Sequence, residues 1–558
     1  MQQLNQALQA GYAALQRGAF AEARRHLEAL DHPQAVHLLG IVEKSDGNLD
    51  AAAELLERAA EMAPSDPDIA NNRGQLARES GQLELAAREL QRALELRAGF
   101  PQARKSLGRV LIDLERWQDA LTVYLEFVEA APNDVSARYG LGTAELNLGQ
   151  AEAAEALFDA LIGEGSDEPQ IRFMRARARL ELGKVDSALE DLQVSYRQVP
   201  GNFSLKTLAS TYWMLEDTAS FEELLAESSG NPDLAVTTAE ILRQSGQPGK
   251  ALAVLDDMRR STELPAESWS VAATAHIDLN HPAEAETAAR ECLRATPEDR
   301  LIKGSLISSL LMQGKAEEAM PHIQAMRLAE PNGQHWIAYE ATALRILGLP
   351  DYAHLVDLDR FVRAYTLPTP AGFDSLEAFN AAFLEALDRW HHYKTHPLDQ
   401  SLRDGSQTPR DLTTIDDPVI RAYVAALDEP IRQYMADVGS GDDHPLTARN
   451  TGDYRITGSW SVRLHGGGRH VNHVHPEGWI SSCYYIFVPE ETRSGDDRAG
   501  WIKFAEPPFE TRPPTPPEKW VRPAAGMLVL FPSFLWHGTH PIHDGSVRVT
   551  APFDAVPA

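Results

Sequence analysis

Histidines cluster near the C-terminal end of this 558-residue sequence. The members of the cluster are His465, His470, His473, His475, His537, His540 and His543. His473 and His475 are two positions apart, so on an extended strand both imidazoles would project to one face and could bind the same metal ion. A third ligand must come from elsewhere in the fold. His537 is the candidate, because it follows an apolar run and a Pro-Ser turn.

The other four histidines of the cluster are predicted to be solvated, although their positions would let them touch a substrate. In contrast, His473, His475 and His537 together favour a metal site, because several polar donors buried on one face need a common partner. Arg548 starts the run RVTAPF eleven residues after His537, and on a strand Arg548 and Thr550 would share a face.

Short apolar runs separated by glycine and proline surround these residues from about Thr451 onward. They are GSWSVRL, WISSCYYIFV, GWIKF, GMLVLF and SVRVTAPF. Their lengths and spacing predict an antiparallel β-sandwich or barrel. The segment 507–526 holds seven prolines and is predicted to be a surface flap or strap. Core packing is predicted for Trp460, Trp479, Cys483, Tyr484 and Trp501.

The first 345 residues repeat with a period of 34. Gly40, Gly74, Gly108 and Gly142 are each 34 residues apart, and an alanine stands twelve residues after each of them. Each period reads as two amphipathic helices, and small residues at fixed positions are needed where two helices cross closely. Between Pro200 and Pro297 the phase shifts, which predicts an irregular or short repeat there.

This pattern resembles the tetratricopeptide repeat over roughly residues 5–345, with about nine units. One helical pair cannot bury its apolar face alone, so the units are expected to stack into a solenoid with a concave surface. The predicted role of that surface is to dock a peptide or protein, and a purely structural spacer or oligomerisation arm is the alternative.

The 34-residue phase ends near Leu349-Pro350, and residues 352–450 are predicted to form helices joined by loops. The helical segments are DLDRFVRAYTL, SLEAFNAAFLEALDRWHHY and DPVIRAYVAALDEPIRQYMADV. HPLDQSLRDGSQT (396–408) is predicted to be a polar loop between the last two of them.

Two ligands on one strand, a distal histidine and an arginine on a later strand fit the architecture of non-haem iron oxygenases. Residues ~395–558 resemble the bacterial putative Fe(II)/2-oxoglutarate oxygenase family, which has a double-stranded β-helix (jelly-roll) fold and is often fused to tetratricopeptide repeats. The resemblance is carried by HPLDQSL, GSWSVRL, HVNHVHPEGWISSCYY, LVLFPSFLWHGTHP and RVTAPFDAVP.

The resemblance implies Fe(II), 2-oxoglutarate and O2 as cofactors, and it implies roles for individual residues. His473 would be the proximal iron ligand and His537 the distal one. Arg548 would bind the far carboxylate of 2-oxoglutarate, and Tyr485 would hydrogen-bond the same group. Weaker candidates for contacts around the cofactor are Asn472, Ser482 and Thr550.

The third ligand departs from the wider superfamily, which has His-x-Asp or His-x-Glu. Either His475 replaces the carboxylate in His473-Val474-His475, or the motif is His475-Pro476-Glu477 and Glu477 is the carboxylate. Strand parity does not decide, because positions 473, 475 and 477 share a face. Two observations favour His473, His475 and His537 as the ligands. One is the sequence distance from the motif to the Tyr-Tyr pair, by analogy with the family. The other is Pro476, which would end regular strand pairing.

Composition excludes several other classes of protein. The sequence has 52 basic and 81 acidic residues, and the resulting net charge of −29 argues against nucleic-acid binding. No stretch approaches the ~18 uninterrupted apolar residues of a membrane span, and the first residues do not follow a signal-peptide pattern. The two cysteines exclude a disulfide scaffold or a cysteine-rich metal site and favour a cytoplasmic location.

The sequence therefore predicts a multi-domain α + β protein. A tetratricopeptide solenoid is expected at 1–345, support helices at 346–450 and a double-stranded β-helix oxygenase core at 451–558. The predicted function is that of an Fe(II)- and 2-oxoglutarate-dependent dioxygenase that hydroxylates a peptide or protein side chain recruited by the repeats. The alternatives are a three-histidine dioxygenase that does not use 2-oxoglutarate, and a binding scaffold with an inactive oxygenase-like domain.

Overall fold

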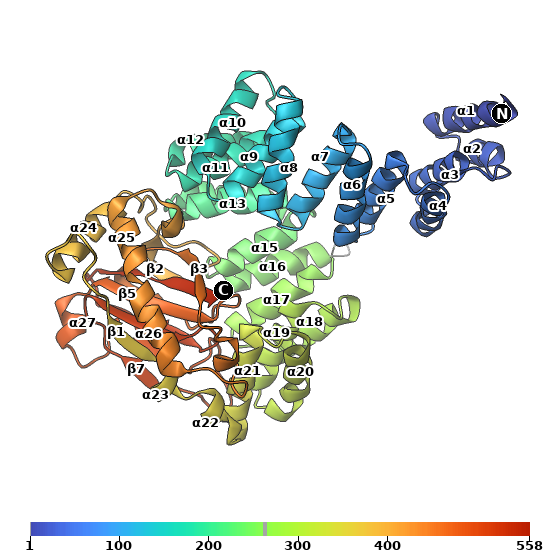
Figure 1. Ribbon diagram of the computed structural model, residues 1–558. Coiled ribbons are helices and arrows are strands. Elements are labelled where there is room, and N and C mark those ends of the chain that lie inside the picture. The colour runs from blue at the N-terminus through green and yellow to red at the C-terminus, as the bar shows by residue number, and fades with distance from the viewer. Residues whose placement is uncertain (1, 261–264) are drawn as a thin grey trace. The chain divides into compact units, whose positions relative to one another are not determined.

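The computed structural model describes residues 2–260 and 265–558 and separates into two compact units, Met1–Leu182 and Gly183–Ala558. The first unit consists of helices, and the second contains further helices followed by a β-rich region (Figure 1). The predicted fold class, a helical repeat array followed by an antiparallel β-domain, is confirmed. No helix in the described ranges is both long enough and apolar enough to cross a bilayer.

Helices of the first unit follow one another through short turns, and neighbours along the chain pack together, as α5 does on α6. Their bounds are α1 (Gln2–Gln16), α2 (Phe20–Leu27), α3 (Pro33–Ser45), α4 (Leu49–Met62), α5 (Pro67–Glu79), α6 (Leu83–Leu96), α7 (Pro101–Asp113), α8 (Trp117–Ala130), α9 (Val135–Asn147), α10 (Ala151–Gly163) and α11 (Pro169–Glu181). Several begin at a proline, which is favoured at the first helical position because its missing N–H has no partner there anyway.

The glycines of the 34-residue repeat lie at close approaches between helices. A Cβ atom added to Gly74 would lie 2.6 Å from Leu90, and one added to Gly108 would lie 2.5 Å from the ring of Tyr124. The contacted residue stands sixteen positions after the glycine in both cases. The repeated alanines Ala52, Ala86, Ala120 and Ala154 are completely buried. The predicted need for small residues at the helix crossings is therefore confirmed in this unit.

The second unit begins with the helices that continue the repeat. Their bounds are α12 (Val185–Gln198), α13 (Asn202–Met214), α14 (Thr218–Ser229), α15 (Ala235–Gln244), α16 (Pro248–Arg259), α17 (Glu267–Asp278), α18 (Pro282–Ala295), α19 (Arg300–Met312), α20 (Ala316–Ala329) and α21 (Gln334–Leu347). Within the expected irregular stretch between Pro200 and Pro297, α14, α16 and α17 have 12 residues each and α15 has 10, whereas α12 before it has 14.

Helices and short turns between the repeat and the sheet support the β-rich region. They are α22 (Asp351–Leu355), α23 (Leu358–Phe361), α24 (Leu376–Asp388), η1 (Leu412–Thr414), α25 (Pro418–Ala426), α26 (Asp428–Val438) and η2 (Thr447–Arg449), and α27 (Glu490–Ser494) follows later. Two tyrosine hydroxyls link these helices to the strands of the β-rich region. The Tyr484 hydroxyl donates to Asn380 of α24 at 2.5 Å, and the Tyr423 hydroxyl of α25 donates to the carbonyl of Ala551 at 2.6 Å.

Two segments that the sequence analysis assigned to a helix and to a loop are strands instead. Residues 363–366, predicted to be helical, form β1 (Arg363–Thr366), which pairs with β8. Pro368 follows closely and disfavours a continued helix, while β8 offers backbone partners. Residues 402–407, predicted to lie in a polar loop, form β2 (Leu402–Gln407) on β4. β2 is an edge strand, and its polar residues hide it from a search for alternating apolar residues.

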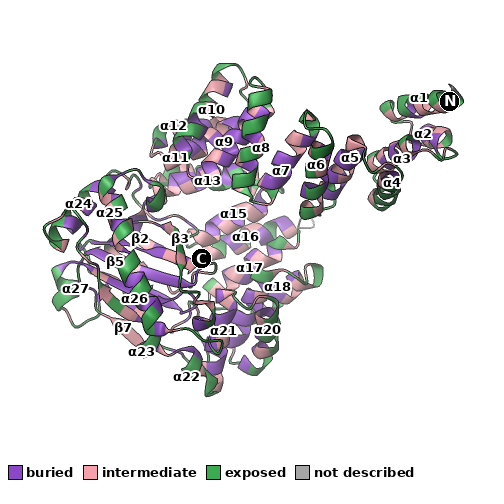
Figure 2. Ribbon diagram, in the orientation of Figure 1, coloured by how far each residue is buried: buried purple, intermediate pink, exposed green. Residues whose placement is uncertain are grey.

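Two antiparallel sheets make up the β-rich region. The remaining strands are β3 (Tyr454–Ser459), β4 (Val462–His470), β5 (Ile480–Phe487), β6 (Ile502–Phe504), β7 (Lys519–Val521), β8 (Met527–Pro532), β9 (His537–Thr539), β10 (Arg548–Ala551) and β11 (Phe553–Pro557). The larger sheet has eight strands with β1-β8-β5-β10-β4-β2 in order, and β11 joins β5 to β3. The smaller sheet has the order β7-β6-β9. Figure 2 shows that the central strands are largely buried.

The proline-rich segment 507–526 lies against the repeat helices of the second unit. The amide of Arg512 donates to the carbonyl of Leu311 at 3.2 Å, and Arg345 donates to the carbonyl of Pro516 at 2.8 Å. Residues 519–521 of this segment pair with β6 as β7. The strap expected from the sequence is thus a docked connection that ties the smaller sheet to α19 and α21.

Candidate metal centre

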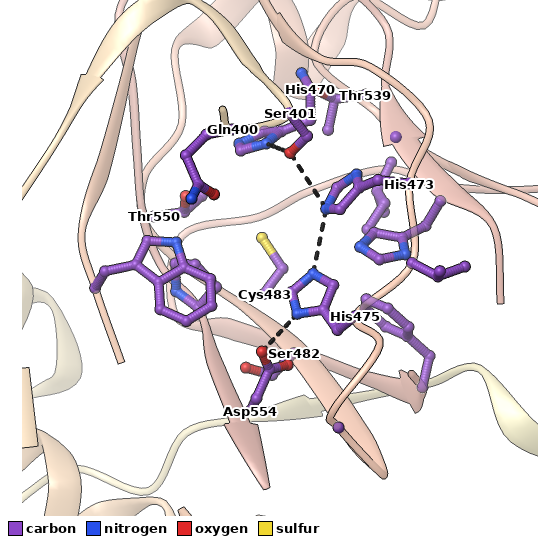
Figure 3. A pocket seen from close by; sticks show the side chains of 18 of the residues that line it. Gln400, Ser401, His470, His473, His475, Ser482, Cys483, Thr539, Thr550 and Asp554 are labelled. Atoms are coloured by element: carbon purple, nitrogen blue, oxygen red, sulfur yellow. Dashed lines mark hydrogen bonds and ion pairs between the residues drawn. The ribbon is translucent and has the colours of Figure 1, made fainter. Parts of the chain in front are cut away.

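A cavity of about 460 Å³ opens between the two sheets (Figure 3). Its walls come from segments distant in sequence: the loop before β2, the segment 473–478, β5, β9 and β10. Figure 3 shows His470, His473 and His475 directed into this space, with Cys483 beside them. The cavity therefore collects most of the residues that the sequence analysis singled out.

His473, His475 and His537 each offer one ring nitrogen to a group whose ligand atoms all lie within 4.8 Å of one another. The expected strand over 473–475 is reduced to a single bridge, because His473 pairs with His537 and His475 lies in the loop beyond it. A further backbone hydrogen bond holds that loop, since the amide of His475 donates to the carbonyl of Ser533 at 3.1 Å.

The hydrogen bonds of the three rings define which nitrogen faces the cavity. Nδ1 of His473 lies 2.8 Å from the carbonyl of Val471, and Nδ1 of His537 lies 2.9 Å from that of Leu535. Nδ1 of His475 lies 2.6 Å from Oδ2 of Asp554. Because a carbonyl or carboxylate oxygen can only accept, each Nδ1 carries the proton and each Nε2 presents a lone pair.

The resulting arrangement fits a cation. Nε2 of His473 and Nε2 of His475 are 3.2 Å apart, close enough for both nitrogens to bind the same cation. Burial lowers the pKa of His473 to about 3, with a further contribution from His475, and burial holds the pKa of His537 well below its usual value. The rings of His473 and His537 therefore stay neutral near pH 7, the form in which imidazole binds a metal ion.

Arg548 of β10 lines the same cavity and is only 1% exposed. Its Nη1 donates to the carbonyl of Gly500 at 2.5 Å, whereas its Nε has no hydrogen-bond partner in the described parts of the chain. The Tyr485 ring is buried beside it, with its centre 5.6 Å from the guanidinium carbon. A buried cation with an unsatisfied N–H makes this end of the cavity suited to an anion.

The weaker cofactor candidates lie in different surroundings. Thr550 is buried, lines the cavity and stands two positions beyond Arg548 on β10. The Ser482 hydroxyl is occupied by the backbone of Phe553 at 2.8 Å, so it joins β5 to β11. The amide of Asn472 donates to Glu506 at 2.7 Å and lies outside the residues that line the cavity.

Two other predicted residues line the cavity. Trp460, expected in the core, packs against a buried cluster that includes Leu402 and Val462, and its half-buried ring also stacks on His475 at a centroid distance of 6.1 Å. His470, expected to be solvated, lines the cavity, and its Nδ1 lies 3.0 Å from the hydroxyl of Ser401. Glu477, the alternative third ligand, is exposed at the mouth and is not part of the three-histidine group.

Sequence reasoning missed two residues that contact the histidines. Asp554 binds His475, and the hydroxyl of Ser401 lies 3.3 Å from Nε2 of His473. Both occur in stretches that carry the family resemblance, RVTAPFDAVP and HPLDQSL, which was the available signal. Their contacts depend on pairing between distant strands, so no local spacing revealed them.

Fold and site together define a helical-repeat protein that carries a double-stranded β-helix with a three-histidine centre. Comparison with protein families agrees. Residues 458–554 match the family described as "Putative 2OG-Fe(II) oxygenase", and residues 37–104, 105–169, 139–203 and 271–333 match the tetratricopeptide repeat family. The chain thus combines tetratricopeptide repeats with a domain of that oxygenase family.

Solved structures similar to the chain are tetratricopeptide-repeat proteins. One from Parabacteroides merdae is 16% identical, with a TM-score of 0.36, and the match covers 50% of this chain and 98% of that one. YrrB, described as a repeat protein with an unusual peptide-binding site, is 21% identical over 33% of this chain and 95% of its own, with a TM-score of 0.29. MamA from Desulfovibrio magneticus is 21% identical over 30% of this chain and 95% of its own, with a TM-score of 0.29. A search of curated proteins gave no match.

Proposed function

We propose that this protein is an Fe(II)- and 2-oxoglutarate-dependent dioxygenase that hydroxylates a polypeptide side chain. The observation that carries the proposal is a buried arginine, Arg548, without a carboxylate partner among the described residues, in the same cavity as the three-histidine group. A metal ion alone would need only the histidines. A metal ion chelated by a dicarboxylate would need the histidines for the metal and the guanidinium for the far carboxylate.

Each residue has a defined task in this proposal. His473, His475 and His537 would hold Fe(II) through Nε2, because their Nδ1 atoms are already engaged. Arg548 would bind the far carboxylate of 2-oxoglutarate by charged hydrogen bonds, and the Tyr485 hydroxyl would add another. Together they would orient the diacid with its keto end towards the histidines.

Fe(II), 2-oxoglutarate and O2, when bound, would supply the oxidising chemistry: one oxygen atom goes to succinate as CO2 leaves, and the other is inserted into a substrate C–H bond. The chain itself needs no general acid or base for this. Its contribution is to bind and orient the reactants and to keep water out, which the apolar wall of Ile502 and Phe531 does beside the histidines.

A polypeptide substrate is supported by a second hollow of about 710 Å³ in the same compact unit. Residues 300–304 of α19 and 334–339 of α21 line one side of it, and Arg449, Pro476 and Glu477 line the other. Pro476 and Glu477 also line the metal cavity, so the two hollows adjoin across these residues. A chain lying on the repeat helices would thereby pass beside the metal centre.

The proposed chemistry is tested by titrating the full chain anaerobically with Fe(II) and 2-oxoglutarate and then admitting O2. We expect a weak visible charge-transfer band and then one succinate for each O2 consumed. Oxygen consumption without succinate would instead indicate a three-histidine dioxygenase. Absence of both the band and oxygen consumption would indicate a binding scaffold.

The peptide assignment is tested with arrayed peptides and mass spectrometry. We expect a gain of one oxygen atom on particular peptides, dependent on 2-oxoglutarate. Leu301→Glu should reduce that yield, because Leu301 is 80% exposed in the hollow on α19. Metal affinity measured on the same preparation controls for folding. Oxidation of free metabolites but of no peptide would overturn the assignment.

A further inference from the structure

Asp554 is the one carboxylate that hydrogen-bonds to a candidate metal ligand in the described parts of the chain. Its Oδ2 lies 2.6 Å from Nδ1 of His475, within reach of a strong charged hydrogen bond. The corresponding Nδ1 atoms of His473 and His537 face neutral backbone carbonyls. The three imidazoles are therefore not equivalent, and His475 alone has an anion behind it.

The position of Asp554 is held by the fold. It lies opposite Ser481 in the pairing of β11 with β5, and the Ser481 hydroxyl donates to its Oδ1 at 2.7 Å. The hydroxyl of Ser533 lies 2.8 Å from that of Ser481 and extends the network. Both Asp554 oxygens thus have defined partners, one of which is the imidazole.

Other carboxylates near the cavity do not take this role. Glu477 is exposed at the mouth, and Asp399 lies 3.8 Å from the ammonium of Lys206. The side chain of Asp554 is only 16% exposed and that of His475 only 14%. Partial burial strengthens a hydrogen bond between charged or polar partners, because less water competes with it.

We propose that Asp554 is a positioning residue that supplies, through His475, the negative charge missing from the three-histidine ligand set. Three neutral imidazoles leave bound Fe(II) with its full charge of two, whereas two histidines and a carboxylate would reduce it to one. A carboxylate behind Nδ1 fixes the tautomer, orients the ring and makes Nε2 a stronger donor. In this chain the carboxylate of Asp554 would not bind the metal directly but would act on it through the ring of His475.

This inference rests on the proposed function, and the test separates the two. Apo wild type, Asp554→Asn, Asp554→Ala and Glu477→Gln are titrated anaerobically with Fe(II), and 2-oxoglutarate is then added. Asn retains a side-chain oxygen that can accept from Nδ1 but has no charge. Glu477→Gln removes a neighbouring charge that does not touch a histidine.

We expect Asp554→Asn to weaken Fe(II) binding about 10- to 100-fold, in the range typical for partners behind a metal-binding histidine. The visible band should move to shorter wavelength, because removing negative charge stabilises the electrons of the iron. Asp554→Ala should be at least as weak, and Glu477→Gln should bind within about twofold of wild type.

If Asp554→Asn bound Fe(II) as tightly as wild type and its visible band did not shift, the inference would be overturned, even if Asp554→Ala bound weakly. Asp554 would then only orient the ring of His475, and its charge would have no effect. Absence of metal binding by wild type would instead overturn the proposed function. Thermal unfolding of the apo variants checks folding. If Asp554→Asn is unstable, Ser481→Ala replaces it: a smaller loss of affinity with the same direction of band shift supports the inference, and no change in either opposes it.

Discussion

His473 and His537 hydrogen-bond to each other through their backbones in both directions. The amide of His473 donates to the carbonyl of His537 at 2.9 Å, and the reverse hydrogen bond measures 3.0 Å. This single bridge fixes two imidazoles from distant parts of the chain side by side, with ring centres 4.2 Å apart. Backbone pairing therefore brings together two of the three candidate metal ligands.

The third ligand can be identified by paired substitutions. His475→Ala should weaken Fe(II) binding by at least about 100-fold, since a site with two remaining imidazoles loses a direct donor. Glu477→Ala should bind Fe(II) like wild type, because Glu477 lies outside the three-histidine group. Isothermal titration under argon measures both. If Glu477→Ala weakened Fe(II) binding and His475→Ala did not, Glu477 would be the third ligand.

Arg548 should be required for 2-oxoglutarate and not for the metal. Arg548→Gln removes the charge and the fork of N–H donors, so 2-oxoglutarate binding should weaken about 100-fold while Fe(II) affinity changes little. Arg548→Lys should recover only part of the loss, because an ammonium cannot bind a carboxylate in the same two-pronged way. The visible band titrated with 2-oxoglutarate reports the affinity. Equal loss of Fe(II) binding would point to a structural role.

Gly108→Ala should destabilise the first unit. The ring of Tyr124 is held between Gly108 and Gly140, and a Cβ atom at Gly108 would lie 2.5 Å from it. Overpacking costs about 1–3 kcal/mol, which exceeds the gain of up to about 1 kcal/mol from better helix propensity. Hydrogen exchange in α7–α9 should therefore accelerate roughly tenfold. Gly99→Ala is the control, since nothing lies within 4 Å of its added Cβ.

Acid should destabilise the second unit through His391. Burial and the nearby Arg463 lower the pKa of His391 to about 3, and its two ring nitrogens contact the hydroxyls of Ser406 and Ser461. The unfolded chain, with an ordinary pKa of about 6.5, then binds the proton more tightly than the folded chain as pH falls. Stability should drop by about 2 kcal/mol between pH 7 and pH 5.

Chemical denaturation of the apoprotein at several pH values measures this slope. His391→Gln keeps a polar partner for the serines and removes the titrating ring. It should therefore lower stability at pH 7 but flatten the dependence between pH 7 and pH 5. An unchanged slope in the variant would assign the acid sensitivity to other groups, such as His396, whose pKa burial lowers to about 4.

The local sequence pattern was sufficient to predict the helical repeats and to select the three histidines that come together in the structure. A 34-residue period needs only neighbouring helices, since Gly74 and Leu90 meet within a single repeat. The separation of His473 and His475 by two residues is likewise local, and it survives although the strand expected there is only a bridge.

Tertiary structure decided what local pattern left open. Which carboxylate hydrogen-bonds to the three-histidine group depends on β11 lying beside β5, which brings Asp554 to His475 across 79 positions of sequence. The edge strands β1 and β2 form because partners on β8 and β4 accept them, and their own residues carry little strand signal. Side-chain alternation reports the face of one strand. Only the pairing of remote strands determines which faces meet, and that pairing is a property of the whole fold.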